Sequence, residues 1–195
     1  SRMLNSMDDS GTEGDVGDRP LYDCVAESPM YELAACNVLK ELLMVVRQRS
    51  TFSLILPEMI LVRSGSEEIC LRDDKAGSSS VGSNTASSCF QPPELSKTSP
   101  ATDLKASMRE AAYAWNLGVV VYTLMAGYPP FASTLPDACP FFADFQLTHR
   151  LACPEHFTTS AIRILVDMLC LEPEQRISIE GLERACDDWR RSILL

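Results

Sequence analysis

The sequence predicts a mainly α-helical domain that carries one short β-hairpin. Apolar residues recur at helical spacing in several segments, and two short β-type runs stand close together between the first two of them. With 195 residues, 46% of them hydrophobic, the chain can bury a core but is too short for two ordinary domains. We therefore expect a single folded domain.

The N-terminal region separates into an acidic tail and the first helix. Residues 1–20 are rich in acidic residues and lack apolar periodicity, so we expect a disordered lead-in, with the domain formed by residues 21–195. The first helix is predicted over 30–49, with Ser28 as its N-cap and Pro29 in its first turn.

The hairpin follows the first helix. Its strands are predicted at Ile60–Val62 and Ile69–Leu71, with turn-forming residues 63–66 between them. Residues 76–89 are small and polar and are expected to form a flexible loop, whereas residues 90–95 contain two prolines and are expected to form a rigid turn.

The rest of the chain is predicted to be helical, over about 108–126, 140–150, 159–170 and 178–194. Residues 111–136 contain no charged side chain, which raises the question of a membrane span. Gly127, Pro129 and Pro130 end the helix too early to cross a bilayer. We expect a buried core helix instead.

The charge and the cysteines limit the possible functions. A net charge of −10, from 17 basic and 27 acidic residues, argues against a nucleic-acid-binding protein and favours basic partners. Eight cysteines are present, but the nearest pair, Cys24 and Cys36, is twelve positions apart, so no metal site is expected. We predict reduced thiols in a cytoplasmic protein.

Three motifs occur in the order and spacing of a known fold. They are FQPPEL at residues 90–95, AWNLGVVVYTLMAGYPPF at 114–131 and MLCLEPEQRISIEGL at 168–182. The series resembles the C-terminal lobe of a protein kinase: the turn that closes the activation segment, the buried F helix, and the run before the last helix. The resemblance implies a C-lobe-like helical domain without an N-lobe.

The residues needed for phosphoryl transfer are missing from the matching positions. Alignment with the kinase catalytic loop places Leu54, Leu56 and Met59 at the catalytic aspartate, the loop lysine and the metal-binding asparagine. Asp73 alone keeps its residue type, and a single carboxylate does not hold a Mg²⁺-nucleotide. We therefore expect no catalysis, no ATP binding and no cofactor.

Two scaffold positions of the kinase fold are retained. Glu94 and Arg176 match a buried ion pair, and because a buried charge without its partner costs about 3–5 kcal/mol, we expect these two residues to contact each other. Tyr113 stands at the position of the F-helix aspartate, which predicts that the loop corresponding to the catalytic loop is not anchored there.

A narrower resemblance comes from the two ends of the domain. SPMYELAACNVLKELL and SIEGLERACDDW are similar to the opening and closing stretches of the kinase non-catalytic C-lobe domain, KIND. The family implies a protein-binding module, as in actin nucleators that hold a basic formin tail, and a cytoskeleton-associated location. The candidate partner-binding carboxylates are Asp137, Asp144, Glu155, Asp187 and Asp188.

Other classes of function remain open. The sequence from Gly127 to Phe131, GYPPF, is closer to an ordinary kinase and keeps a C-lobe fragment of a kinase or of another pseudokinase as the alternative. A degenerate structural remnant is a third. His149 and His156 lie near no nucleophile motif, which argues against an unrelated hydrolase.

Overall fold

The computed structural model describes residues 19–21, 23, 25, 28–62, 69–71, 88–95 and 104–195. Its helices are α2 (Glu32–Arg47), α3 (Ala106–Ala126), α4 (Pro140–Thr148), α5 (Thr159–Met168) and α6 (Ile179–Leu194). Its strands are β1 (Arg19–Pro20), β2 (Ile60–Val62) and β3 (Ile69–Leu71), and its 3₁₀ turns are η1 (Pro57–Met59) and η4 (Pro136–Ala138). The mainly helical fold with a short hairpin is confirmed.

The small sheet contains the predicted hairpin and an additional strand. β2 and β3 pair antiparallel as expected, while the turn at 63–66 lies outside the described residues. Arg19 and Pro20, which we expected in the disordered lead-in, instead pair with Val62 and Leu61 as β1. A stretch of two residues, one of them a proline, is too short to be predicted as a strand from the sequence. It forms one only because the edge of β2 lies beside it.

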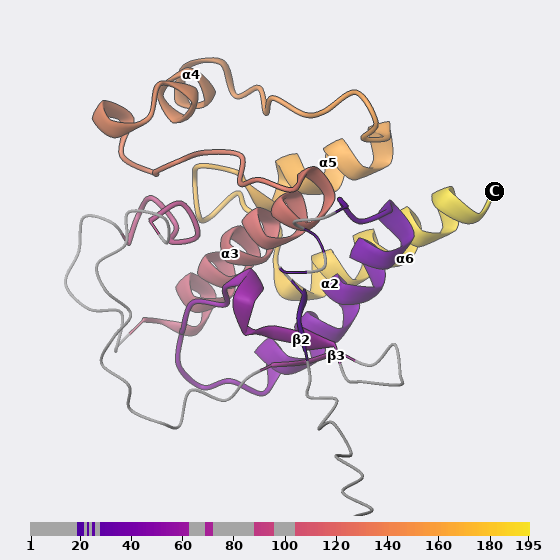
Figure 1. The fold of residues 1–195 in the computed structure, drawn as a ribbon. Coiled ribbons are helices and arrows are strands. Elements are labelled where there is room, and N and C mark those ends of the chain that lie inside the picture. Colours follow the sequence, from indigo (N-terminus) through magenta and orange to yellow (C-terminus); the bar gives the residue numbers. More distant parts are fainter. Residues whose placement is uncertain are drawn as a thin grey trace, which may run out of the picture.

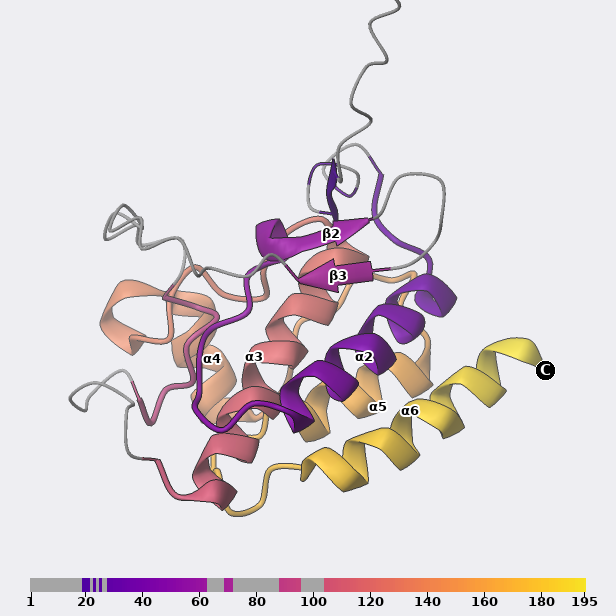
Figure 2. The same cartoon turned by 90° about the horizontal axis from the view of Figure 1, so that it is seen from below.

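Helix α3 is the core of the domain. Residues 111–126 are buried on every side, as the charge-free run predicts for a core helix. The helix ends at Gly127, whose φ of 80° lies in the left-handed region that glycine adopts at helix C-termini. Figures 1 and 2 show α3 in the middle of the body, with α2, α5 and α6 packed around it.

Close contact between α3 and α5 depends on a glycine. A Cβ atom at Gly118 would lie 3.0 Å from both Leu169 Cδ2 and Met168 Cβ, closer than such atoms normally approach. The missing side chain therefore lets the two helices pack tightly at this point.

Helix α2 starts later than the sequence predicts. It begins at Glu32 with Tyr31 as N-cap, and neither Ser28 nor Pro29 caps it. The preceding chain is extended because the amide of Met30 donates a hydrogen bond of 2.8 Å to the carbonyl of Leu124 near the end of α3. The later helices agree with the predicted ranges to within two residues at each end.

Glu32 joins the start of α2 to two other helices. Its carboxylate accepts hydrogen bonds from Thr158 N at 2.6 Å, Thr158 Oγ1 at 2.8 Å and Trp189 Nε1 at 3.1 Å. Thr158 is also the N-cap of α5, where its hydroxyl accepts from the amide of Ala161. A single side chain therefore connects the beginnings of α2 and α5 to the middle of α6.

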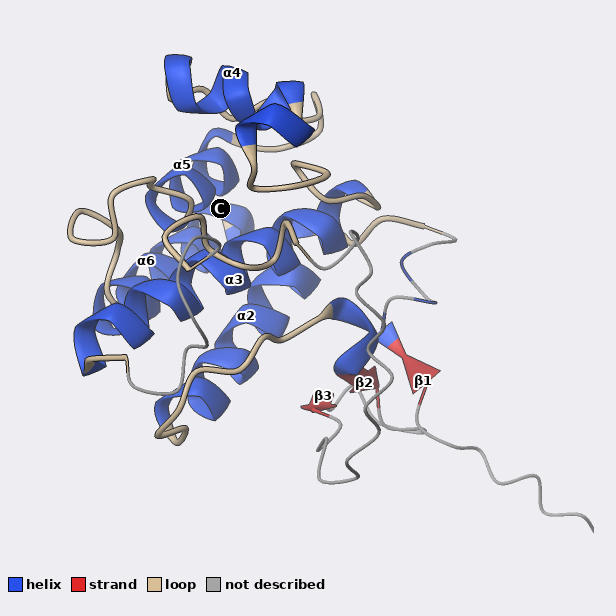
Figure 3. Ribbon diagram, turned by 90° about the vertical axis from the view of Figure 1, so that its left-hand side faces the viewer, coloured by secondary structure: helices blue, strands red, loops and turns tan. Residues whose placement is uncertain are grey.

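Helix α4 and the sheet lie on different sides of the helical body. In Figure 3, α4 lies above the other helices, and the three strands lie to the side of α2. An aromatic cluster attaches α4 to α3: Phe142 lies edge-on to Trp115 with ring centroids 6.3 Å apart, and Phe131 lies 5.1 Å from Phe145. The opposite side of α4 is left exposed to solvent.

Candidate functional site

The loop that corresponds to the kinase catalytic loop is firmly attached to α3. The hydroxyl of Tyr113 donates to the carbonyl of Thr51 at 2.9 Å and accepts from the amide of Ser53 at 3.3 Å. Asn116 Oδ1 accepts from the amide of Ile55 at 2.8 Å, and Asn116 Nδ2 donates to the carbonyl of Ile55 at 2.9 Å. The expectation that the loop is not anchored at Tyr113 is wrong, because a phenol can accept the backbone hydrogen bond in place of a carboxylate.

The side chains of this loop are mainly apolar. Phe52 packs against Tyr113 with ring centroids 5.0 Å apart, and Leu54 and Leu56 are partly buried against the core. None of these three groups can accept a proton or bind a metal ion. Asp73, the carboxylate that the alignment retains, lies outside the described residues.

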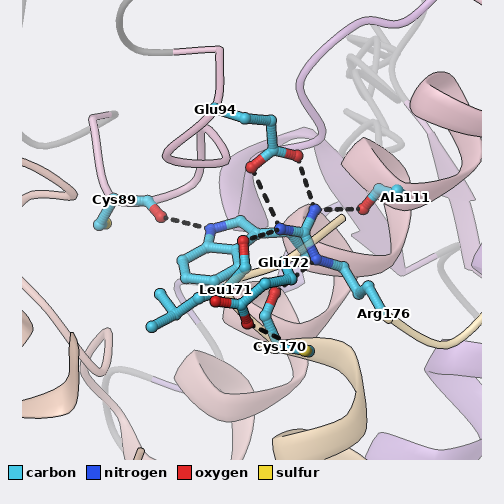
Figure 4. Close-up of polar contacts among 8 residues, drawn as sticks. Cys89, Glu94, Ala111, Cys170, Leu171, Glu172 and Arg176 are labelled. Carbon is cyan, nitrogen blue, oxygen red and sulfur yellow. Dashed lines mark hydrogen bonds and ion pairs between the residues drawn. The ribbon is translucent and has the colours of Figure 1, made fainter. Parts of the chain in front are cut away.

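Arg176 is buried in a cage of hydrogen-bond acceptors (Figure 4). Its Nη1 and Nη2 atoms donate to the two carboxylate oxygens of Glu94 at 2.7 and 3.1 Å, in a bidentate pair. Its remaining donors reach the carbonyls of Cys170, Ala111 and Leu171 at 2.8, 2.8 and 3.4 Å. All five N–H groups of the guanidinium are thus satisfied.

The same guanidinium lies over the indole of Trp115, 5.1 Å from the ring centroid. Trp115 in turn donates from Nε1 to the carbonyl of Cys89 at 3.3 Å, next to the turn that carries Glu94 (Figure 4). The arginine therefore fastens the turn at residues 92–95 to α3 and to the loop between α5 and α6. Its role in the described structure is to hold the scaffold together.

The structure divides the five predicted partner-binding carboxylates into two groups. Asp187 and Asp188 on α6 are already engaged, because Lys40 Nζ lies 2.5 Å from Asp187 Oδ1 and Asp188 forms an ion pair with Arg191. Asp137, Asp144 and Glu155 form no ion pair with any residue in the described ranges, and their side chains are exposed. Of the five carboxylates, those without an ion-pair partner among the described residues therefore lie on α4 or next to it.

Exposed apolar side chains occur beside two of these free carboxylates. Leu135, Phe141 and Leu147 are 44%, 72% and 84% exposed. With Asp137 and Asp144 they form a surface, the α4 face, on η4 and the outer side of α4. Its two acids were predicted from the sequence, but its exposed apolar residues were not. On α4, Phe142 and Phe145 are buried, whereas Phe141 and Leu147 are exposed. The sequence alone does not show which of these side chains pack into the aromatic cluster.

A pocket of about 300 Å³ opens on another part of the molecule, where the end of α2 meets the beginnings of α3 and α6. Its charged lining is mixed, with Arg47, Arg49 and Arg109 beside Glu110 and Glu180. Charges of both signs at its walls give it no strong preference for a cation or an anion.

The described residues contain no candidate metal site and no candidate membrane span. In those ranges no three or more His, Cys, Asp or Glu side chains come together in a way that could hold a metal ion. No helix in the described part of the chain is both long and apolar enough to cross a membrane.

No family model matches this sequence. Parts of the chain are similar to protein kinases. CBL-interacting protein kinase 24 of Oryza sativa subsp. japonica is 35% identical over 79 residues, 40% of this chain and 16% of that protein. Tribbles homolog 1 of Homo sapiens is 32% identical over 85 residues, 44% of this chain and 22% of that protein. Serine/threonine-protein kinase cek1 of Schizosaccharomyces pombe is 33% identical over 75 residues.

The chain spans less than a quarter of the length of these relatives. The similarity to protein kinases is therefore partial. It agrees with the architecture, in which helices with a small hairpin form a fold like the C-terminal lobe of a kinase.

Proposed function

We propose that this kinase C-lobe-like domain is a non-catalytic protein-interaction module of the KIND type. The proposal rests on one observation above all: residues 52–56 are held in place by Tyr113 and Asn116, yet their side chains provide no carboxylate, imidazole or amide for proton transfer or metal binding. The scaffold is preserved where the chemistry of a kinase is lost.

We assign the binding site to the α4 face, because it combines exposed apolar groups with carboxylates that lack a partner among the described residues. The partner that fits is a basic peptide with apolar side chains, such as the formin tail that the family resemblance implies. Phe141 and Leu147 supply contact area, and Asp137 and Asp144 supply attraction for Lys or Arg.

Fluorescence anisotropy with a labelled Lys/Arg-rich formin tail peptide tests this assignment. We expect affinity to fall as salt rises from roughly 50 to 200 mM, and Asp137→Lys with Asp144→Lys to weaken binding by about tenfold or more. The matched control is Glu41→Lys with Glu174→Lys, which changes the charge equally at two exposed carboxylates outside α4 that form no ion pair with a described residue. Equal loss in both variants, or no binding at low salt, would contradict the assignment to the α4 face.

A second function, a C-lobe fragment of a catalytic kinase, is favoured by the partial similarity to CBL-interacting protein kinase 24. Thermal unfolding with and without Mg²⁺-ATP tests whether nucleotide binding is retained. The interaction module should show no change in melting temperature. A rise of several degrees would mean that the nucleotide binds and that its concentration is well above its Kd, which would support the kinase fragment.

A further inference from the structure

Two buried cysteines face each other across the interface between α2 and α6. Cys36 and Cys186 are 150 positions apart in the sequence, yet their Sγ atoms lie 3.3 Å apart and both residues are 0% exposed. Each thiol also lies 3.5 Å from the main-chain carbonyl oxygen of the other residue. The two side chains therefore point at one another from opposite helices.

Two ion pairs near the thiols join α2 to α6 and fix the register of the helices. Lys40, one turn after Cys36, pairs with Asp187, the residue next to Cys186. Arg47 pairs with Glu183 at 2.7 Å, one turn before Cys186. Because both pairs join α2 to α6, a sliding movement that would separate the sulfurs is opposed from two points.

We propose that Cys36 and Cys186 form a reversible disulfide bond in the presence of a low-molecular-weight disulfide such as oxidised glutathione, and that this bond locks α6 onto α2. The first thiolate attacks a sulfur of the small disulfide, forms a mixed disulfide and releases one thiolate of the reagent. The second cysteine then attacks the protein sulfur of the mixed disulfide and releases the other. Two protein thiols are oxidised, and one small disulfide is reduced to two thiols.

The close contact between the two thiols shifts their pKa values in opposite directions. The hydrogen bond from Cys186, together with the charge of Lys40, lowers the pKa of the Cys36 thiol, although burial opposes this effect. The hydrogen bond to Cys36 and burial raise the pKa of the Cys186 thiol. Either sulfur can donate the hydrogen bond between them, and attack by either one followed by the other gives the same disulfide.

Access to the buried sulfurs requires α6 to open locally. Leu194 in the final turn of α6 is 64% exposed, so few contacts within the described structure hold that turn. A transient opening of α6 exposes both thiols at once, and closure brings them back to a distance from which a bond can form. Once the bond has formed, this opening is suppressed.

The disulfide between Cys36 and Cys186, called the clamp below, is independent of the proposed partner binding. It joins α2 to α6, whereas the α4 face lies on η4 and α4 and attaches to the body through Phe142 and Phe145. A bond between Cys36 and Cys186 is therefore expected to alter the stability of the C-terminal helix and to leave the affinity for a basic peptide unchanged.

Incubation of the whole protein with oxidised glutathione, followed by mass spectrometry of the intact chain and its peptides, tests the proposal. We expect a product lighter by two hydrogens, with a cross-link between the peptides of Cys36 and Cys186, reversed by dithiothreitol. The melting temperature of this product should rise by roughly 5–15 °C. Addition of glutathione without a cross-link, or a cross-link between other cysteines, would overturn the assignment.

Single substitutions separate the pair from the remaining thiols. Cys36→Ala and Cys186→Ala should each abolish the cross-link and the rise in melting temperature, while Cys153→Ala and Cys170→Ala, at partly exposed positions, should preserve both. If either buried variant fails to fold, the peptide map of the unaltered protein still decides the outcome. A cross-linked product that is no more stable than the reduced protein would contradict the clamp.

Discussion

Arg176 and Glu94, 82 positions apart in the sequence, form a bidentate ion pair in which the guanidinium is completely buried. The arginine side chain is 0% exposed and the glutamate side chain 16% exposed. The pair expected from the kinase-like motifs therefore has the geometry in which its loss is most costly.

Glu94→Ala should lower the free energy of unfolding by about 3–5 kcal/mol, because it leaves a buried guanidinium without its carboxylate. Urea denaturation monitored by circular dichroism measures the change. The control is Arg184→Ala, which removes an exposed pair with Glu180 and should cost about 0.5 kcal/mol or less. A cost for Glu94→Ala as small as that of the control would mean that the pair is open in solution.

Tyr113→Phe should lower the free energy of unfolding by about 1–3 kcal/mol, since it removes two hydrogen bonds that fix the loop and leaves the amide of Ser53 unpaired. Hydrogen exchange should show faster exchange at that amide. Tyr31→Phe, at a side chain that is 87% exposed, provides the matched control and should change neither quantity. Unchanged exchange at Ser53 in the Tyr113 variant would show that the hydroxyl does not hold the loop.

The Lys40–Asp187 pair predicts a dependence of stability on pH. The hydrogen bond from Lys40 lowers the pKa of Asp187 below its ordinary value of 3.8. The stabilisation is therefore present above about pH 4 and is lost as the pH falls through the lower pKa of the folded state. At the alkaline end, the hydrogen bond to Asp187 raises the pKa of Lys40 above 10.5, so its contribution is lost as the pH rises through that higher value.

Asp187→Asn should accordingly lower the melting temperature slightly at pH 7, and the difference from the unaltered protein should be smaller at about pH 3, because the stabilisation begins to be lost once the pH falls below the ordinary value of 3.8. Differential scanning calorimetry at the two pH values measures this. Glu174→Gln removes an exposed carboxylate that forms no ion pair with a described residue and should show no such difference. A constant difference at both pH values would exclude the ion pair as its source.

Some features of the fold could be predicted from the sequence because they depend on local chemistry. The charge-free run that ends at Gly127 predicts a buried helix, and α3 is that helix. The strand at Arg19–Pro20 could not be predicted, since it exists only through pairing with β2. The start of α2 was displaced for a similar reason: a hydrogen bond from Met30 to Leu124, distant in sequence, overrides the local capping signal of Ser28.

The candidate site shows the same division between local and distant information. The sequence identified Asp137 and Asp144, but residue type alone could not distinguish them from Asp187, which is paired with Lys40 on another helix. Tyr113 was misjudged because its position suggested a lost aspartate, whereas its hydroxyl reaches the same stretch of backbone. In both cases the missing information was the identity of a partner far along the chain.

The packing of α2 on α6 has a consequence for the synthesis of this protein. The apolar side of α2, from Ala35 to Val46, emerges from the ribosome long before α6, which packs against it. Cys36 on α2 and Cys186 on α6 are 150 positions apart in the sequence. Contacts that join such distant segments form late and slow the search for the native state. The nascent chain must therefore carry part of this apolar surface without its α6 cover until residues 179–194 have been synthesised, and chaperones can bind such a surface in the meantime.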